Sequence, residues 1–165
     1  MMVVADAAVF IAGVEGAEFV TVREVIEELR STDARLRAEV ALSSGKLRVL
    51  EASEPWVSRV RRAAAESGDA ARLSETDIKL LALALELAER EEVVVMSDDY
   101  SVQNLASLLG LRFMPVAEAG IKRRFGWRKV CTGCGRVYPP EHRGECTFCG
   151  SEVRLRRKKG RVRGR

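Results

Sequence analysis

The chain is organised around an apolar, β-branched run that ends abruptly in charged residues. Residues 93–96 are all Val or Met, and Ser97, Asp98 and Asp99 follow directly. Such a run is typical of a strand buried on both faces of a parallel sheet, and ligands bind beyond the carboxyl ends of such strands. The two carboxylates, with the amide of Asn104 one turn later, therefore indicate a metal site. The alternative is that Ser97 or Asp98 simply caps the next helix.

Strand-like and helical patterns alternate along the first two thirds of the chain. Short apolar runs predict strands at residues 2–5, 18–21, 46–50, 93–96 and 111–114. Amphipathic or strongly helical stretches between them predict helices at residues 22–29, 33–42, from 54 to about 67, from 73 to about 90, and from 100 to about 109. This alternation predicts an α/β fold, an α/β/α sandwich with a central, mainly parallel sheet.

Further candidate carboxylate ligands lie at the ends of the predicted strands and in the predicted helices. Asp6 directly follows the first predicted strand, where it could be a ligand or a helix cap. In the helix at 22–29, Glu28 flanks the apolar stripe and Glu24 lies nearly opposite, so Glu28 is better placed to reach the sheet edge. Ser74 and Asp77 match a capping box, and a carboxylate at this helix N-terminus is also kept ionised for metal binding. For any one of the glutamates, simple solvation is the competing interpretation.

Charge divides the chain into two unequal parts. Residues 1–120 hold 13 Lys and Arg against 21 Asp and Glu, a net charge of −8, whereas residues 121–165 hold 15 against 3, a net charge of +12. A basic segment of this density favours an anionic partner, most commonly nucleic acid, over a merely solubilising tail. The candidate RNA-binding residues are Lys122, Arg123, Arg124, Arg128, Lys129, Arg156, Arg157, Lys158 and Lys159.

The four cysteines form two Cys-x-x-Cys pairs, Cys131 with Cys134 and Cys146 with Cys149. Two such pairs predict a structural zinc site with four thiolate ligands, which leaves no open position for catalysis. A glycine after each pair permits the tight turn around the sulfurs. His142, the only histidine, is interpreted as a loop residue. Since no histidine is available for the acidic site, its metal is expected to be Mg²⁺ or Mn²⁺, hard cations that prefer oxygen ligands.

Composition also indicates in which cellular compartment the protein is found. The chain contains no apolar run of 18 or more residues, and its first residues meet an acid at once without a basic stretch. With 165 residues it can bury one good core and carry a small accessory module. Paired cysteines favour metal over disulfides. We therefore expect a soluble, intracellular, cytoplasmic protein.

Three segments together resemble the acidic motifs of PIN-domain nucleases. They are residues 3–7, residues 73–77 and residues 97–104, which carry Asp6, Asp77 and the Asp98-Asp99 pair. With a C-terminal zinc ribbon they closely resemble the archaeal form of the Nob (NIN-one-binding) family, over residues 2 to about 153. The resemblance implies a PIN domain at 1–116, a linker at 117–127, a zinc ribbon at 128–153 and a basic tail at 154–165.

The resemblance also implies a function and a set of site residues. These endoribonucleases mature the 3′ end of small-subunit ribosomal RNA, so the expected partners are that precursor and the pre-ribosomal small subunit. The implied catalytic carboxylates are Asp6, Glu28, Asp77 and Asp99, with Asp98 and Glu24 as alternatives; Asp6, Asp77 and Asp99 would bind Mg²⁺ or Mn²⁺, and the four cysteines zinc. Two other interpretations are a toxin-type PIN ribonuclease and a non-catalytic RNA-binding assembly factor.

Overall fold

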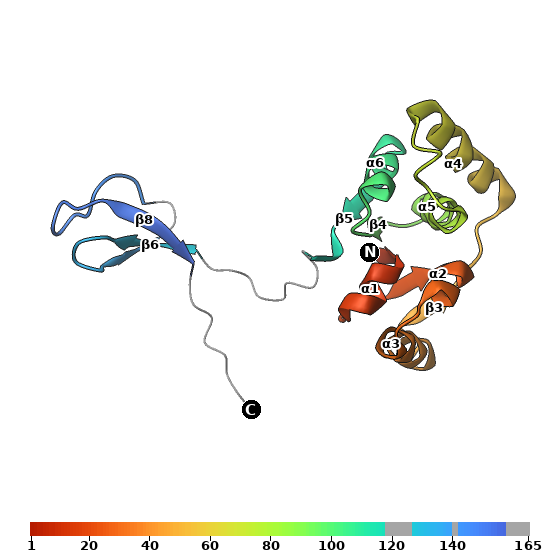
Figure 1. Ribbon diagram of the computed structural model, residues 1–165, viewed down its shortest axis with the longest axis horizontal. Helices are drawn as coiled ribbons and strands as arrows, with labels where there is room; N and C mark the ends of the chain where they lie inside the picture. Colours follow the sequence, from red (N-terminus) through yellow and green to blue (C-terminus); the bar gives the residue numbers. More distant parts are fainter. Residues whose placement is uncertain (118–126, 140–141, 158–165) are drawn as a thin grey trace. The chain divides into compact units, whose positions relative to one another are not determined.

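A computed structural model describes residues 1–117, 127–139 and 142–157. The chain forms two compact units, residues 1–120 and residues 121–165 (Figure 1). Among the described residues, no helix is both long and apolar enough to cross a membrane. The two units are built on different principles, and each is described by itself.

The first unit contains a five-stranded sheet in which every pairing is parallel. The strand order is β3-β2-β1-β4-β5. The strands are β1 (Met2–Ala5), β2 (Phe19–Thr21), β3 (Leu47–Val49), β4 (Val93–Met96) and β5 (Arg112–Met114). The helices are α1 (Ala7–Ala12), α2 (Arg23–Glu28), α3 (Thr32–Ser43), α4 (Glu54–Ser67), α5 (Glu75–Ala88) and α6 (Tyr100–Leu108). The predicted α/β fold with its parallel sheet is confirmed.

Helices cover both faces of this sheet. On one side α1 packs against α3, and on the other α4, α5 and α6 pack against one another (Figure 1). All four residues of β1 and all four of β4 are buried, as expected for strands covered on both faces. Helix α5 lies against both strands and buries Leu80, Leu81 and Leu83. Each such side chain contributes about 1.5–3 kcal/mol to folding, so this unit is stabilised by its apolar core.

The path of the chain through the sheet decides where the functional groups emerge. From β1 the chain moves outward through β2 and β3, then returns to add β4 and β5 on the other side of β1. Strands β1 and β4 are therefore neighbours at the topological switch point, where open α/β sheets bind ligands. Ala5 pairs with Met96 at the last position of both strands. Asp6 and Ser97 consequently leave the sheet side by side.

The second unit is a three-stranded antiparallel sheet with the order β7-β6-β8. The strands are β6 (Trp127–Cys131), β7 (Val137–Tyr138) and β8 (Val153–Arg157). Strand β8 continues to Arg157, so the sheet includes residues 154–157, which composition predicts to be part of the basic tail. Their backbone pairs with β6 throughout, which needs no apolar side chains and is therefore not marked by composition. Residues 118–126 of the predicted linker and residues 158–165 of the predicted tail lie outside the described residues.

Candidate functional site

Asp6 is held at the carboxyl end of β1 by the start of α1 and by the neighbouring strand. Its Oδ1 accepts a hydrogen bond of 2.6 Å from the backbone N–H of Ala7, as the N-cap of α1. Its Oδ2 accepts a hydrogen bond of 2.6 Å from the hydroxyl of Ser97, which is 1% exposed. The cap and the ligand interpretations of Asp6 are thus compatible, because the backbone contact uses only one of the two carboxylate oxygens.

The adjacent acids Asp98 and Asp99 have different surroundings. Asp99 caps α6 by accepting from the backbone N–H groups of Ser101 and Val102, and its own N–H donates to the Ser97 hydroxyl oxygen at 3.1 Å. Asp98 Oδ1 instead accepts from the backbone N–H of Val116 at 2.7 Å, and so fixes the segment that follows β5. Ser97 therefore links Asp6 to Asp99, whereas Asp98 has a structural partner elsewhere.

Asp77 occupies the predicted capping box at the start of α5. Its Oδ2 accepts from the N–H of Ser74 at 2.8 Å, and the Ser74 hydroxyl accepts from the N–H of Asp77 at 3.1 Å. Burial raises the pKa of the Asp77 carboxyl above its usual range, and the charges of Asp6 and Asp99 raise it further, against the hydrogen bonds from Ser74 that lower it. The negative charges of Asp6 and Asp99 therefore repel that of Asp77. A bound cation offsets that repulsion, so the three carboxylates fit a metal site.

Two glutamates of α2 face α5 through different partners. Glu28 accepts a hydrogen bond of 2.5 Å from the hydroxyl of Thr76, the buried neighbour of Asp77. Glu24 forms an ion pair with Lys79, and this hydrogen bond lowers the pKa of the Glu24 carboxyl. Glu24 is thus neutralised by a lysine, while Glu28 bonds to a neutral hydroxyl beside Asp77. These contacts favour Glu28 over Glu24 as the fourth acidic position.

The amide nitrogen of Asn104 bonds to another part of the first unit, and this contact leaves its metal-binding oxygen uncommitted. Its Nδ2 donates to Asp69 Oδ2 at 2.7 Å and so ties α6 to the connection between α4 and α5. Asp69 lies 35 residues upstream, a long-range contact that helical spacing cannot reveal. Sequence reasoning also missed Gln103, whose side-chain N–H donates to the backbone oxygen of Ser97 at 2.7 Å and braces the corner that holds Asp6.

The carboxylate oxygens of the acidic site are spaced more widely than the ligand atoms of the cysteine cluster. Among the residues that the structure describes, only the four cysteines bring three or more ligand atoms within 4.8 Å of one another. Mg²⁺ usually keeps several waters and binds through one or two carboxylates, so an open oxygen-only cluster fits it better than a transition metal that favours nitrogen or sulfur.

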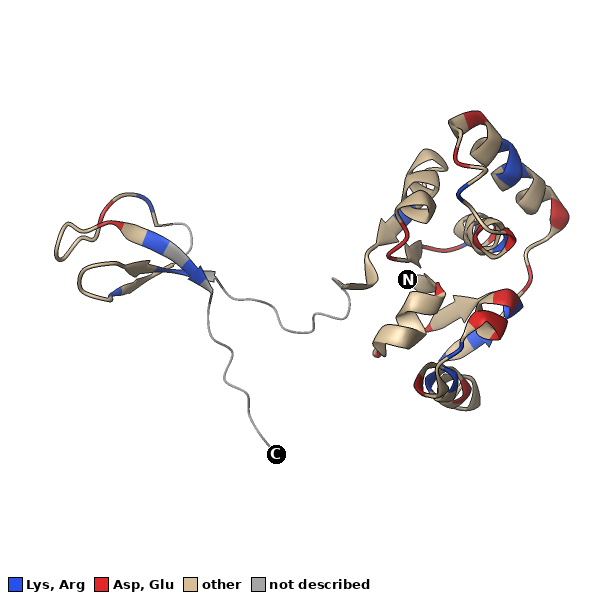
Figure 2. Cartoon of the chain, viewed as in Figure 1, with Lys and Arg blue, Asp and Glu red and all other residues tan. Residues whose placement is uncertain are grey.

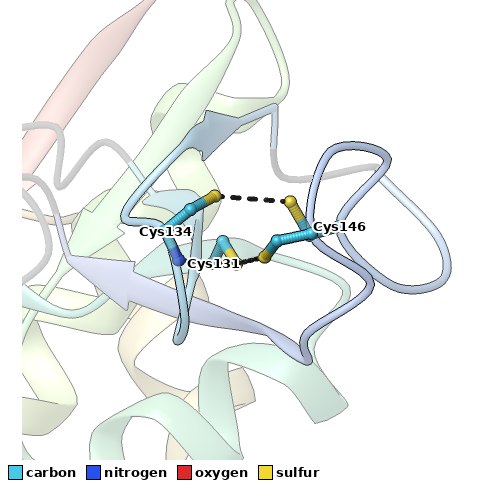
Figure 3. Close-up of side chains that lie close together, drawn as sticks. Cys131, Cys134 and Cys146 are labelled. Atoms are coloured by element: carbon cyan, nitrogen blue, oxygen red, sulfur yellow. Dashed lines mark hydrogen bonds between the residues drawn. The ribbon is translucent and has the colours of Figure 1, made fainter.

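The cysteine cluster is compact and can bind a metal. Cys131 and Cys149 have sulfurs 3.4 Å apart, and Cys134 and Cys146 have sulfurs 3.5 Å apart (Figure 3). Tetrahedral zinc–sulfur bonds of about 2.3 Å separate their sulfurs by roughly 3.8 Å, close to this arrangement. Gly133 packs closely on Ser151, because a Cβ there would lie 2.4 Å from the Ser151 hydroxyl oxygen and 3.0 Å from the Ser151 Cβ, so a side chain would displace Ser151.

Tyr138 supports the cluster from β7, a role that sequence reasoning did not assign. Its hydroxyl lies 3.0 Å from Cys146 Sγ, and this hydrogen bond lowers the pKa of the Cys146 thiol to about 5. The backbone N–H of Arg136 lowers the pKa of Cys134, but burial and hydrogen bonds with the other sulfurs outweigh it and raise that pKa to about 11. His142 packs on the Tyr138 ring, with ring centres 4.2 Å apart.

Only part of the predicted RNA-binding set can be placed. Lys122, Arg123, Arg124, Lys158 and Lys159 lie outside the described residues, and the side chain of Arg157 is not described. Arg128 and Arg156 lie directly opposite each other on β6 and β8, and Lys129 donates to the backbone oxygen of His142. Figure 2 shows basic residues on these strands, whereas the helices of the first unit carry both acidic and basic residues.

Comparison with known proteins agrees with this arrangement. A family model described as the PIN domain of ribonuclease matches residues 3–87. The chain is 43% identical over 156 residues to the endoribonuclease Nob1 of Methanothermobacter thermautotrophicus, covering 93% of this chain and 91% of that protein. It is 41% identical over 158 residues to Nob1 of Pyrococcus abyssi, covering 94% and 93%. Ribonuclease VapC3 of Aeropyrum pernix is 41% identical over 113 residues, covering 66% of this chain and 81% of that protein. The chain therefore belongs to the Nob1 family of PIN-domain endoribonucleases.

Proposed function

We propose that this protein is a metal-dependent endoribonuclease that matures the 3′ end of small-subunit ribosomal RNA during ribosome biogenesis in the cytoplasm. The observation that carries the proposal is the link between Asp6 and Asp99 through Ser97, together with the rise that their charges cause in the pKa of Asp77. Clustered carboxylates without histidine suit phosphodiester hydrolysis assisted by Mg²⁺ or Mn²⁺. The similarity to Nob1 endoribonucleases over nine tenths of the chain supports the ribosomal substrate.

In this mechanism the protein supplies position and charge. Asp6, Asp77 and Asp99 would hold Mg²⁺ or Mn²⁺, and a bound ion of this kind would activate water and stabilise the leaving oxygen. Ser97 orients Asp6 through its hydroxyl and Asp99 through its contact with the backbone N–H. Glu28, fixed by the Thr76 hydroxyl, adds a further carboxylate beside Asp77. Asp98 accepts hydrogen bonds from the backbone N–H groups of residues 116 and 117, and so holds in place the turn after β4 that begins with Ser97.

The second unit is proposed to bind zinc through its cysteines and the RNA backbone through its arginines. Like charges directly opposite each other on neighbouring strands destabilise a sheet, as with Arg128 and Arg156. The Nε atom of Arg128 is also buried without a hydrogen-bond partner among the described residues. A phosphate group bound by the two arginines relieves the repulsion between their charges, and such binding depends on salt. Arg128 and Arg156 are therefore the described members of the RNA-binding set best supported by geometry.

The test uses a labelled RNA that spans the 3′ end of small-subunit ribosomal RNA and its trailer. The protein is incubated with it in Mn²⁺, in parallel with Asp6→Asn and with Glu39→Gln, a control that changes an exposed carboxylate of α3. We expect a cut at the mature end that is lost in Asp6→Asn and kept in Glu39→Gln. Tight binding without metal-dependent cleavage would contradict the nuclease and favour a non-catalytic assembly factor.

A toxin-type ribonuclease is the second candidate, because a VapC ribonuclease is as similar to this chain as one of the Nob1 proteins, although over a smaller share of it. The same experiment separates the two functions. Cleavage scattered over unrelated single-stranded RNA, with no preference for the mature end, would favour the toxin-type enzyme.

A further inference from the structure

An aromatic ring stands exposed in the second cysteine pair. Phe148 lies between Cys146 and Cys149, and 69% of its surface is accessible to solvent. The guanidinium carbon of Arg136 lies 3.9 Å from the centre of the ring. Scattered exposed apolar residues are normal on protein surfaces. An exposed ring paired with a cation over its face is a more specific arrangement.

The backbone around both residues is held by the cysteine cluster. The N–H of Gly135, next to Arg136, donates to the backbone oxygen of Cys131 at 3.1 Å. In the same way, the N–H of Gly150 donates to the backbone oxygen of Cys146 at 2.9 Å and closes the turn that contains Phe148. The two side chains therefore project from turns fixed by the metal-binding cysteines. Ordering them for a ligand costs little entropy, which favours binding.

The chemistry of the pair fits a nucleobase. Bases of single-stranded RNA stack on aromatic rings and on arginine guanidinium planes, and every base has a π-face. The charge of residues 121–165, 15 basic against 3 acidic, attracts the phosphates that accompany such a base. An apolar pocket of a protein partner would have to bury the Arg136 guanidinium along with the ring, which is costly without an acidic group.

We propose that Arg136 and Phe148 form a stacking site for an unpaired base of RNA. The site is separate in kind from the Arg128–Arg156 pair, which contacts phosphates and carries no preference for unpaired bases. The inference deepens the proposed function and rests on it only in taking RNA as the ligand. It assigns to the second unit a preference for single strands.

The test measures RNA binding by the full-length, metal-loaded chain, carrying Asp6→Asn so that the RNA is not cut. Anisotropy titrations use a labelled single-stranded RNA of mixed sequence and a duplex of the same length. Phe148→Ala should weaken single-strand binding by about fivefold or more and leave duplex binding unchanged. Phe148→Trp should restore binding, and its fluorescence should be quenched by the stacked base. Val137→Ala is the matched control, since Val137 is an apolar residue of β7 that is 57% exposed and lies next to Arg136.

Salt dependence distinguishes stacking from charge. The slope of log K against log salt should be unchanged in Phe148→Ala and reduced by about one in Arg128→Ala. Metal content, measured for each variant, guards against loss of the neighbouring cysteine site. Equal single-strand affinity in Phe148→Ala, or an equal loss for duplex RNA, would overturn the inference. Cleavage of the precursor RNA is measured separately, with the protein that retains Asp6. Failure of the stacking site and failure of the processing function therefore remain distinguishable.

Discussion

The two units of this protein reach a fixed structure by opposite means. The first unit buries a continuous set of apolar side chains, including Val4, Val20, Val95 and Leu105, all 0% exposed. In the second unit, the only buried apolar residues among those described are Cys131 and Cys146. Those two residues also belong to the cysteine cluster that can bind a metal. In the first unit, then, the functional groups are added to the edge of a core that folds without them, whereas in the second the binding groups are the core.

Metal removal should affect the two units most differently, by unfolding the second and leaving the first folded. Structural zinc contributes about 10–16 kcal/mol to folding in small zinc modules, more than the whole stability of many domains. We expect a strong chelator to abolish amide exchange protection in β6 and β8 while leaving β1, β4 and α5 protected. Hydrogen exchange read residue by residue measures both units in one sample.

A cysteine variant provides the matched control for chelation. Cys149→Ser should reproduce the loss of protection in β6 and β8 without any chelator, because it removes one of the four sulfurs within 4.8 Å. Protection of β6 that survives in both conditions would mean that the antiparallel sheet is stable by itself, and the contrast between the units would fail.

The second prediction concerns the adjacent acids Asp98 and Asp99. Asp99→Asn keeps a good helix cap, because Asn and Asp are equivalent N-caps, but removes a charge from the metal site. We expect RNA cleavage to fall on the order of 100-fold or more, with little change in unfolding free energy. Asp98→Asn weakens the contacts to Val116 and Ala117 and should cost about 1 kcal/mol of stability while cleavage stays within about threefold.

Both variants are measured by initial cleavage rates and by urea unfolding. The opposite result, with Asp98→Asn inactive and Asp99→Asn active, would move the metal ligand to Asp98. Equal loss of activity in both would mean that the Ser97 corner acts only as a unit.

The contrast between these neighbours shows how far the sequence alone could lead. Apolar runs and periodicity predicted the five strands of the first unit and helices α2 to α6, and the capping box of Ser74 and Asp77 was predicted from four residues of sequence. The contact between Ser97 and Asp6 depends on β4 lying beside β1, which is set by the crossing of the chain and not by any local pattern. The contacts of Asp98 with Val116 and of Asn104 with Asp69 are long-range hydrogen bonds of the same kind.

In the second unit the sequence predicted the cysteine cluster, but not the length of strand β8 or the role of Tyr138. Cysteine spacing predicted the ligand cluster, because four thiolates at such intervals can close on one ion. Strand β8 ran past the predicted boundary, since arginines pair their backbones as well as apolar residues do. Tyr138 was missed because an aromatic residue between two cysteine pairs has no spacing rule that marks it as a sulfur partner.

The third prediction tests whether the second unit depends on more than its four ligands. Tyr138→Phe removes the hydroxyl that lowers the pKa of Cys146 to about 5, so this thiol should hold its proton to higher pH. Because the metal binds thiolate, we expect affinity to fall about 10-fold, and by more at pH 6 than at pH 8. Competition with a chromogenic chelator measures it, with Val137→Ala as control. An unchanged affinity at pH 6 would assign Tyr138 a packing role alone.

The smallest expected effect lies back in the first unit, at the ion pair between Glu24 and Lys79. Lys79 lowers the pKa of Glu24, so the pair stabilises the fold above the ordinary glutamate pKa of about 4.3 and loses that contribution as the pH falls through the lower folded value. Lys79→Met should therefore lower the unfolding free energy slightly at pH 7 and less in acid, because a partly exposed ion pair contributes little. Urea unfolding followed by helical circular dichroism measures this difference, and Lys46→Met, which changes an exposed lysine, is the control. A cost that persists unchanged in acid would mean that Lys79 acts through the packing of its methylene chain, and that even this charged edge of the first unit is held by apolar contact.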